Sequence, residues 1–167
     1  MPSDAARPPK QLSIDELESY LHTNIPLTRA MQVTVRGISD QGVTLAAPFA
    51  PNINHHETVF GGSVSTLATL AAWCQVHTRL LSEGIVSRLV IQRSTMEYEA
   101  QMCGDFTATS AFAREGDWPG FLKLLRRRGK ARIAVTALVA SAGEIAGQFH
   151  GEFVALEAGH ARAETDV

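Results

Sequence analysis

The chain has 167 residues, of which 45% are hydrophobic and 19% are charged, so its length and composition indicate one globular domain with a large core and exclude a disordered protein. Fifteen Lys and Arg residues against 17 Asp and Glu residues give a formal net charge of −2, which leaves no overall basic field for binding nucleic acid or an anionic membrane surface. Because an average soluble domain is roughly 25% charged, we expect a partner copy to cover part of the surface in a homo-oligomer.

The two ends of the chain are expected to be flexible. Residues 1–12 lack the basic-then-apolar pattern of a secretory signal, and Pro2, Pro8 and Pro9 predict an extended arm. Residues 157–167 are expected to form a loose tail.

The two cysteines have no CxxC spacing, which favours neither a zinc site nor a secreted disulfide framework. We therefore expect a cytoplasmic protein.

Capping and turn residues divide the first part of the chain. Ser13 and Glu16 have the spacing of a capping box, which predicts a helix that ends before Pro26. Residues 32–39 and 43–48 alternate in polarity or are β-branched, and the Asp-Gln-Gly sequence between them favours a turn. These two segments predict a β-hairpin.

A loop over residues 49–60 is expected to lead into a long helix over residues 61–82, which starts with two glycines. Residues 61–78 carry no formal charge but include seven Ser, Thr, Gln and His residues. That polar content favours a buried helix of a soluble domain over a membrane span. Cys74 has apolar neighbours in mid-helix and is expected to be a small core residue.

The second half of the chain has the period-two, β-branched pattern of strands. Four strands are predicted: residues 86–99, 105–114, 130–141 and 144–156. Between the second and the third, Asp117 as an N-cap and Pro119 in the first turn predict a short amphipathic helix that ends at Gly129. One long helix after a hairpin, followed by an antiparallel meander, predicts an α+β fold in which a curved sheet wraps a single central helix.

The segment from Asn52 to Gly62 resembles the loop-to-helix motif of small hotdog-fold acyl-CoA thioesterases. Other segments resemble the thioesterase-like domain often found behind an acetyltransferase domain in bacterial proteins: Ile25 to Met31, Leu45 to Pro48, Phe60 to Ser63 and Gly129 to Arg132. The resemblance covers residues 13–156. It implies a hotdog fold and hydrolysis of an acyl thioester of coenzyme A or of an acyl carrier protein, without a metal or another cofactor.

Two glycines at a helix start leave backbone N–H groups unshielded by Cβ atoms, so a thioester carbonyl oxygen can approach them. The resemblance implies that the N–H of Gly62 binds this oxygen. Because the predicted helix lacks the carboxylate of related enzymes, Asn54 and Thr69 are expected to hold the attacking water. His56 and Glu57 are second-rank candidates for the base.

Departures from the family pattern keep other interpretations open. Thr69 stands where phenylacetyl-CoA-type enzymes have an aspartate, and the predicted helix has no carboxylate before Glu83. Glu57 replaces an expected glycine and Gln101 an expected proline. Asn54 alternatively shapes an Asx turn, and the Thr69 hydroxyl alternatively bonds the preceding helical turn. A non-catalytic module that binds acyl-CoA or acyl carrier protein is therefore the second hypothesis, and a hydratase or dehydratase is the third.

Further residues are expected to contact the substrate. Beside the glycine turn they are Phe60, Gly61 and Ser63. At the densest cluster of positive charge they are Arg128, Lys130 and Arg132, which are expected to hold the phosphates of coenzyme A. Lys130 and Arg132 lie two apart in a predicted strand and so share a face, although a solvated helix end also explains the cluster. No distant third ligand accompanies the His55-His56-Glu57 run, so no metal site is expected.

Overall fold

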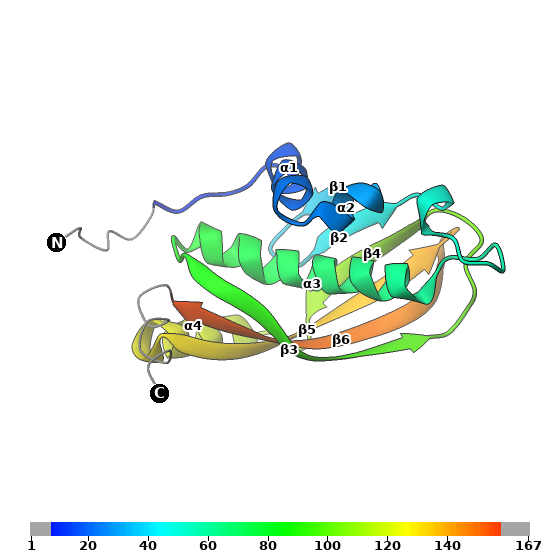
Figure 1. Ribbon diagram of the computed structural model, residues 1–167. Helices are drawn as coiled ribbons and strands as arrows, with labels where there is room; N and C mark the ends of the chain where they lie inside the picture. The colour runs from blue at the N-terminus through cyan, green and yellow to red at the C-terminus, as the bar shows by residue number, and fades with distance from the viewer. Residues whose placement is uncertain (1–7, 158–167) are drawn as a thin grey trace, which may run out of the picture.

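The computed structural model describes residues 8–157, in which a curved antiparallel sheet of six strands wraps around one long helix (Figure 1). The strands are β1 (Thr34–Ile38), β2 (Val43–Ala47), β3 (Ser87–Tyr98), β4 (Phe106–Phe112), β5 (Lys130–Ser141) and β6 (Glu144–Glu157). Their order in the sheet is β1-β2-β4-β5-β6-β3, so β1 and β3 are the edge strands. The predicted α+β architecture and its four C-terminal strands are confirmed. Residues 1–7 and 158–167, on which most of both expected flexible ends fall, lie outside the described residues.

Within the described residues, four α-helices and one 3-10 helix accompany the sheet. They are α1 (Ile14–Asn24), α2 (Pro26–Ala30), the 3-10 helix η1 (Ala50–Asn52), α3 (Gly61–Ser82) and α4 (Asp117–Arg128). The sequence predicted α1, α3 and α4 but neither α2 nor η1, which are too short to show helical periodicity. In α4 the N-cap is Gly116, with φ +87°, and not Asp117 as predicted, because only the residue before Asp117 leaves the helical conformation.

The capping box predicted for α1 is confirmed. The Ser13 hydroxyl accepts a hydrogen bond from the N–H of Glu16, and the Glu16 carboxylate accepts one from the N–H of Ser13. This backbone hydrogen bond, together with Lys10, lowers the pKa of Glu16. The Lys10 N–H also donates to the carbonyl of Leu81, at 2.9 Å. The segment before α1 is thereby attached to the C-terminal end of α3.

The core lies between α3 and the concave face of the sheet. Its largest fully buried side chains include Leu67 of α3 and Leu45, Phe106 and Phe153 of the strands. Cys74 is fully buried among them, and burial raises the pKa of its thiol, which confirms its expected place in the core.

One face of α3 remains partly exposed between α1 and β3 (Figure 1). Its half-buried residues follow helical spacing and carry no formal charge: Gly62, Thr66, Thr69, Trp73 and His77. The His77 ring stacks on Trp73, with ring centroids 4.4 Å apart, and on Tyr20 of α1, at 5.0 Å. Burial in this stack lowers the pKa of His77 to about 4.

Candidate functional site

A pocket of about 300 Å³ opens at the N-terminal end of α3. One wall comes from α2, the other from the first turns of α3, and η1 lies between them. The lining residues are Leu27, Ala30, Met31, Pro51, Asn52, Phe60, Gly62, Ser63 and Thr66. Leu27 and Phe60 are 52% and 54% exposed, so two large apolar side chains lie at the pocket surface without being buried in the core. An apolar pocket with a few polar groups is the usual form of a small-molecule site.

The first turn of α3, which contributes to this pocket, has backbone N–H groups without an acceptor among the described residues. Phe60 is the N-cap and makes no side-chain capping bond. Its own N–H donates to the carbonyl of Asn52 at 2.8 Å, and the first intrahelical bond runs from the N–H of Val64 to the carbonyl of Phe60. Within residues 8–157 no acceptor remains for the N–H groups of residues 61–63, as expected for the start of a helix. Of these residues, Gly62 and Ser63 line the pocket.

The two glycines have different surroundings. A Cβ atom on Gly62 would overlap the ring of Phe60, which lies against the helix start. A Cβ atom on Gly61 would be 3.5 Å from the ring of Tyr98, an ordinary contact. The Tyr98 hydroxyl donates to the carbonyl of Gly61 at 3.1 Å and attaches the end of β3 to α3. The missing Cβ therefore matters most at Gly62, where it leaves room for the Phe60 ring beside the free N–H groups.

Asn54 adopts the Asx-turn conformation in the loop before α3. Its Oδ1 atom accepts hydrogen bonds from the N–H groups of His56 (2.8 Å) and Thr58 (3.3 Å), and its Nδ2 atom donates to the Thr58 hydroxyl. Glu57 has φ +56°, a left-handed conformation that favours glycine, which explains why glycine is expected there. His56 and Glu57 are exposed. None of Asn54, His56 and Glu57 lines the pocket at the start of α3.

Thr69 lies on the same face of α3 as Gly62, two turns further along. Its hydroxyl donates to the carbonyl of Ser65 at 2.8 Å, the local bond that the alternative interpretation expects. Thr69 is seven positions after Gly62 in the helix, a distance of about 10 Å. One water molecule cannot contact both residues within a single chain.

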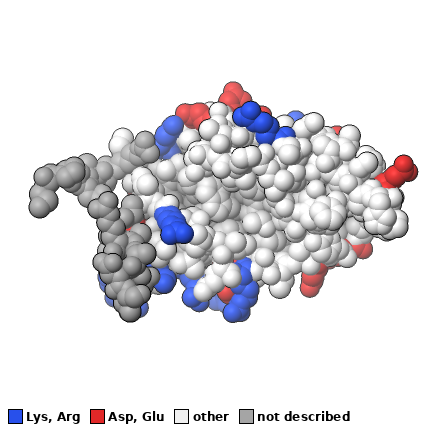
Figure 2. Space-filling view, in the orientation of Figure 1, with Lys and Arg blue, Asp and Glu red and all other residues white. Residues whose placement is uncertain are grey.

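The predicted phosphate-binding residues lie at the other end of the molecule. Lys130 and Arg132 are exposed while Ala131 and Ile133 are buried, which confirms that the two basic side chains share one face of β5. Arg128 ends α4, and the preceding Arg126 and Glu83, just after α3, form an ion pair at 3.0 Å. Figure 2 shows Lys and Arg side chains along the lower edge of the molecule, toward the α4 end. Because the 22 residues of α3 span about 33 Å, one chain does not bring this cluster to the pocket.

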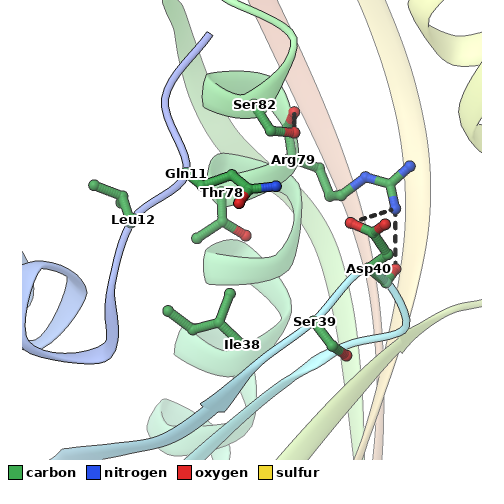
Figure 3. Close-up of a pocket in the computed structure, with 8 residues that line it drawn as sticks. All are labelled: Gln11, Leu12, Ile38, Ser39, Asp40, Thr78, Arg79 and Ser82. Atoms are coloured by element: carbon green, nitrogen blue, oxygen red, sulfur yellow. Dashed lines mark hydrogen bonds and ion pairs between the residues drawn. The ribbon is translucent and has the colours of Figure 1, made fainter.

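A second pocket, of about 290 Å³, lies near the C-terminal end of α3 (Figure 3). Arg79 donates to the backbone carbonyl of Asp40 at 3.1 Å and pairs with its carboxylate at 3.3 Å. The hydroxyls of Thr78 and Ser82 donate to helix carbonyls. Arg79 therefore holds α3 to the β1–β2 turn, and the two hydroxyls are used within the helix.

Two further observations concern metal binding and membrane insertion. The rings of His55 and His56 have centroids 3.8 Å apart, and within residues 8–157 no group of three His, Cys, Asp or Glu side chains is placed to hold a metal ion. Across the same residues, no helix combines the length and hydropathy needed to cross a membrane.

Asn52 is a residue of the pocket that the sequence analysis did not single out. It is 2% exposed, and its Nδ2 atom donates to the carbonyls of Met31 and Pro48. These partners lie 21 and 4 residues away along the chain. Its only signal in the sequence is its place in the loop motif, in which Asn54 was predicted to be the functional asparagine.

Comparisons with known proteins agree on the fold and the family. A protein of unknown function from Chlorobaculum tepidum is 25% identical, with a TM-score of 0.79 over 88% of this chain and 98% of that chain. A "putative thioesterase" from Shewanella oneidensis is 26% identical, with a TM-score of 0.77 over 86% and 96% of the two chains. A thioesterase from Haemophilus influenzae, 9% identical, shares the fold, with a TM-score of 0.70 over 89% and 93%. Residues 14–157 match the family described as "Putative thioesterase (yiiD_Cterm)". The chain therefore has the hotdog fold and belongs to this thioesterase family.

Proposed function

We propose that the protein hydrolyses acyl-CoA thioesters. Water adds to the thioester carbonyl, the C–S bond breaks, and the products are a carboxylic acid and free coenzyme A. The observation that carries this proposal is the uncapped start of α3, where Gly62 and Ser63, whose N–H groups have no acceptor within residues 8–157, line a pocket with large apolar side chains. Such donors stabilise the oxyanion that develops on the carbonyl oxygen, while the apolar side chains of Leu27 and Phe60 accept the acyl group.

The attacking water needs a second polar group, and the geometry favours one from another copy of the chain. Gly62 and Thr69 of one chain are about 10 Å apart along α3, so we assign the water to Thr69 of a second copy. An assembly is supported by the uncharged, half-buried face of α3 and by β3, an edge strand whose Val90 and Ile91 are 36% and 39% exposed. An unpaired edge strand is a template for pairing with another chain.

The same assembly supplies a place for coenzyme A. The Ser87 end of β3 lies near the basic cluster, because Arg88 pairs with Leu156, which also pairs with Lys130. The Tyr98 end of β3 contacts Gly61. A two-fold axis that pairs two β3 strands in antiparallel fashion sets the Ser87 end of one copy opposite the Tyr98 end of the other. Arg128, Lys130 and Arg132 of the second copy then approach the pocket end, where we propose that they hold the phosphates of the substrate.

A second candidate function is binding of acyl-CoA or an acyl carrier protein without catalysis. It is favoured by the absence of any carboxylate in residues 61–82 and by the place of His56 and Glu57, which do not line the pocket. The hydratase or dehydratase hypothesis is less favoured, because none of the residues that line this pocket in one chain is Asp, Glu or His.

Free-thiol release from short, medium, long and aromatic acyl-CoA substrates tests the proposal. Hydrolysis at this site is supported if at least one class of acyl-CoA is turned over and if turnover falls strongly when the start of α3 is obstructed by Gly62→Ala. Saturable binding of acyl-CoA with no thiol released by the folded protein supports the binding module and contradicts hydrolysis. Comparison of each acyl-CoA with the matching acyl carrier protein then identifies the thiol carrier.

A further inference from the structure

Asn52 connects three segments that surround the pocket. Its Nδ2 atom donates to the carbonyl of Met31, just after α2, at 3.0 Å and to the carbonyl of Pro48, just after β2, at 2.8 Å. Its backbone carbonyl accepts the N–H of Phe60, the residue before α3, at 2.8 Å. Only an amide side chain supplies two N–H donors from one short, neutral group. Asn52 therefore holds the two walls of the pocket, α2 and the start of α3, at a fixed separation.

The remaining polar atom of this side chain is unusual. Within residues 8–157, Asn52 Oδ1 is buried and has no hydrogen-bond partner, although buried polar atoms are nearly always paired. The assignment of the amide is unambiguous, because both partners of the nitrogen are carbonyls. Asn52 also lines the pocket beside Gly62. A residue with a buried, unpaired acceptor thus belongs to the lining of a pocket whose helix start has free donors.

We propose that Asn52 is a positioning residue for the thioester site. Its side-chain bonds to Met31 and Pro48 fix the backbone of residue 52, and the carbonyl of that fixed backbone holds Phe60. The side chain thereby sets where α3 begins and where the N–H groups of Gly62 and Ser63 lie. An amide at this position leaves Oδ1 buried without a partner among the described residues, which lowers stability, so what the side chain provides is the pair of donor bonds that fix the pocket walls. This inference rests on the proposed hydrolysis at α3. A displacement of about 1 Å at such a site reduces turnover by up to 10²-fold.

The test compares Asn52→Leu with a matched control, Gln75→Leu. Gln75 is also fully buried, donates its amide N–H to one carbonyl, that of Gln41, and has an unpaired Oε1. It lies on α3 about 20 Å from Gly62. Both variants lose buried amide hydrogen bonds, so both are expected to be less stable. Thiol release is measured on each at a temperature where circular dichroism shows it to be folded, and amide hydrogen exchange is followed at Phe60 and Val64.

We expect Asn52→Leu to lower kcat about tenfold or more, with KM within about twofold, and to speed exchange at Phe60. Gln75→Leu should do neither. Equal kcat values for the two folded variants, or unchanged exchange at Phe60 in Asn52→Leu, would overturn the proposal. If Asn52→Leu does not fold, Asn52→Ser, which retains one donor, takes its place under the same criteria. A folded wild type that releases no thiol contradicts the proposed function, and the exchange measurement then still decides whether Asn52 holds the helix start.

Discussion

Replacing Gly62 by alanine adds one methyl group at the proposed oxyanion site and tests whether the start of α3 binds the thioester oxygen. A Cβ atom at this position overlaps the Phe60 ring, but that ring is 54% exposed and has room to rotate away. The fold should therefore tolerate the change, and alanine in place of a helical glycine adds up to about 1 kcal/mol of stability. The methyl group takes the place that the Phe60 ring fills, and we expect the displaced ring to enter the space in which the thioester oxygen approaches the N–H groups. Removal of one oxyanion donor costs about 10²–10³ in kcat, and we expect a loss of about 10²-fold.

Thiol release at saturating acyl-CoA gives kcat, and urea unfolding gives the free energy of unfolding of the same preparation. Gly120→Ala in α4 is the matched control, because a Cβ atom there meets nothing within 4 Å. It should raise stability by a similar amount and leave kcat unchanged. A folded Gly62→Ala variant with kcat within twofold of the wild type would refute the assignment of the thioester oxygen to the start of α3.

Three further predictions concern other parts of the molecule. Thr69→Val is nearly isosteric and should lower kcat about 10²-fold without unfolding, as thiol release and circular dichroism check; an unchanged kcat removes Thr69 from the mechanism. Replacing Lys130 and Arg132 together by alanine should raise KM for acyl-CoA and weaken its salt dependence, while kcat and KM for an acyl-pantetheine stay the same; unchanged affinity for acyl-CoA at low salt would make the cluster a solvated surface. Because burial lowers the pKa of His77 from 6.5 to about 4, the unfolded chain binds a proton first as pH falls, and stability is lost between pH 6.5 and 4, by up to about 3 kcal/mol. Urea unfolding at pH 7 and pH 4.5 should show a smaller loss for His77→Phe than for the wild type, and equal losses would contradict this assignment.

The elements with strong local signals were predicted from the sequence. The capping box of Ser13 and Glu16 depends on contacts three residues apart, and the period-two strands show their buried face in every second residue. The helix start at Gly61 and Gly62 was also visible, because paired glycines are costly in a helix unless close approach requires them. These features need no knowledge of distant residues.

The site needed tertiary structure. Asn52 acts through the carbonyl of Met31, 21 residues earlier, which no spacing rule identifies. Asn54 was conspicuous as part of a motif, yet its side chain is occupied by the turn that it forms. The distance between Lys130 and the glycines is set by the length of α3. The sequence motifs predicted that both contact one substrate, but motifs give no information about that distance. That separation is the reason why the proposed site draws on a second copy.

The measurement that tests the central claim most directly is free-thiol release by the wild-type protein across acyl-CoA substrates of differing chain length and aromaticity. Hydrolysis at the start of α3 predicts turnover of at least one acyl class, with a preference for apolar acyl groups because Leu27 and Phe60 lie at the pocket surface. A folded protein that binds acyl-CoA saturably and releases no thiol from any member of the panel would contradict it.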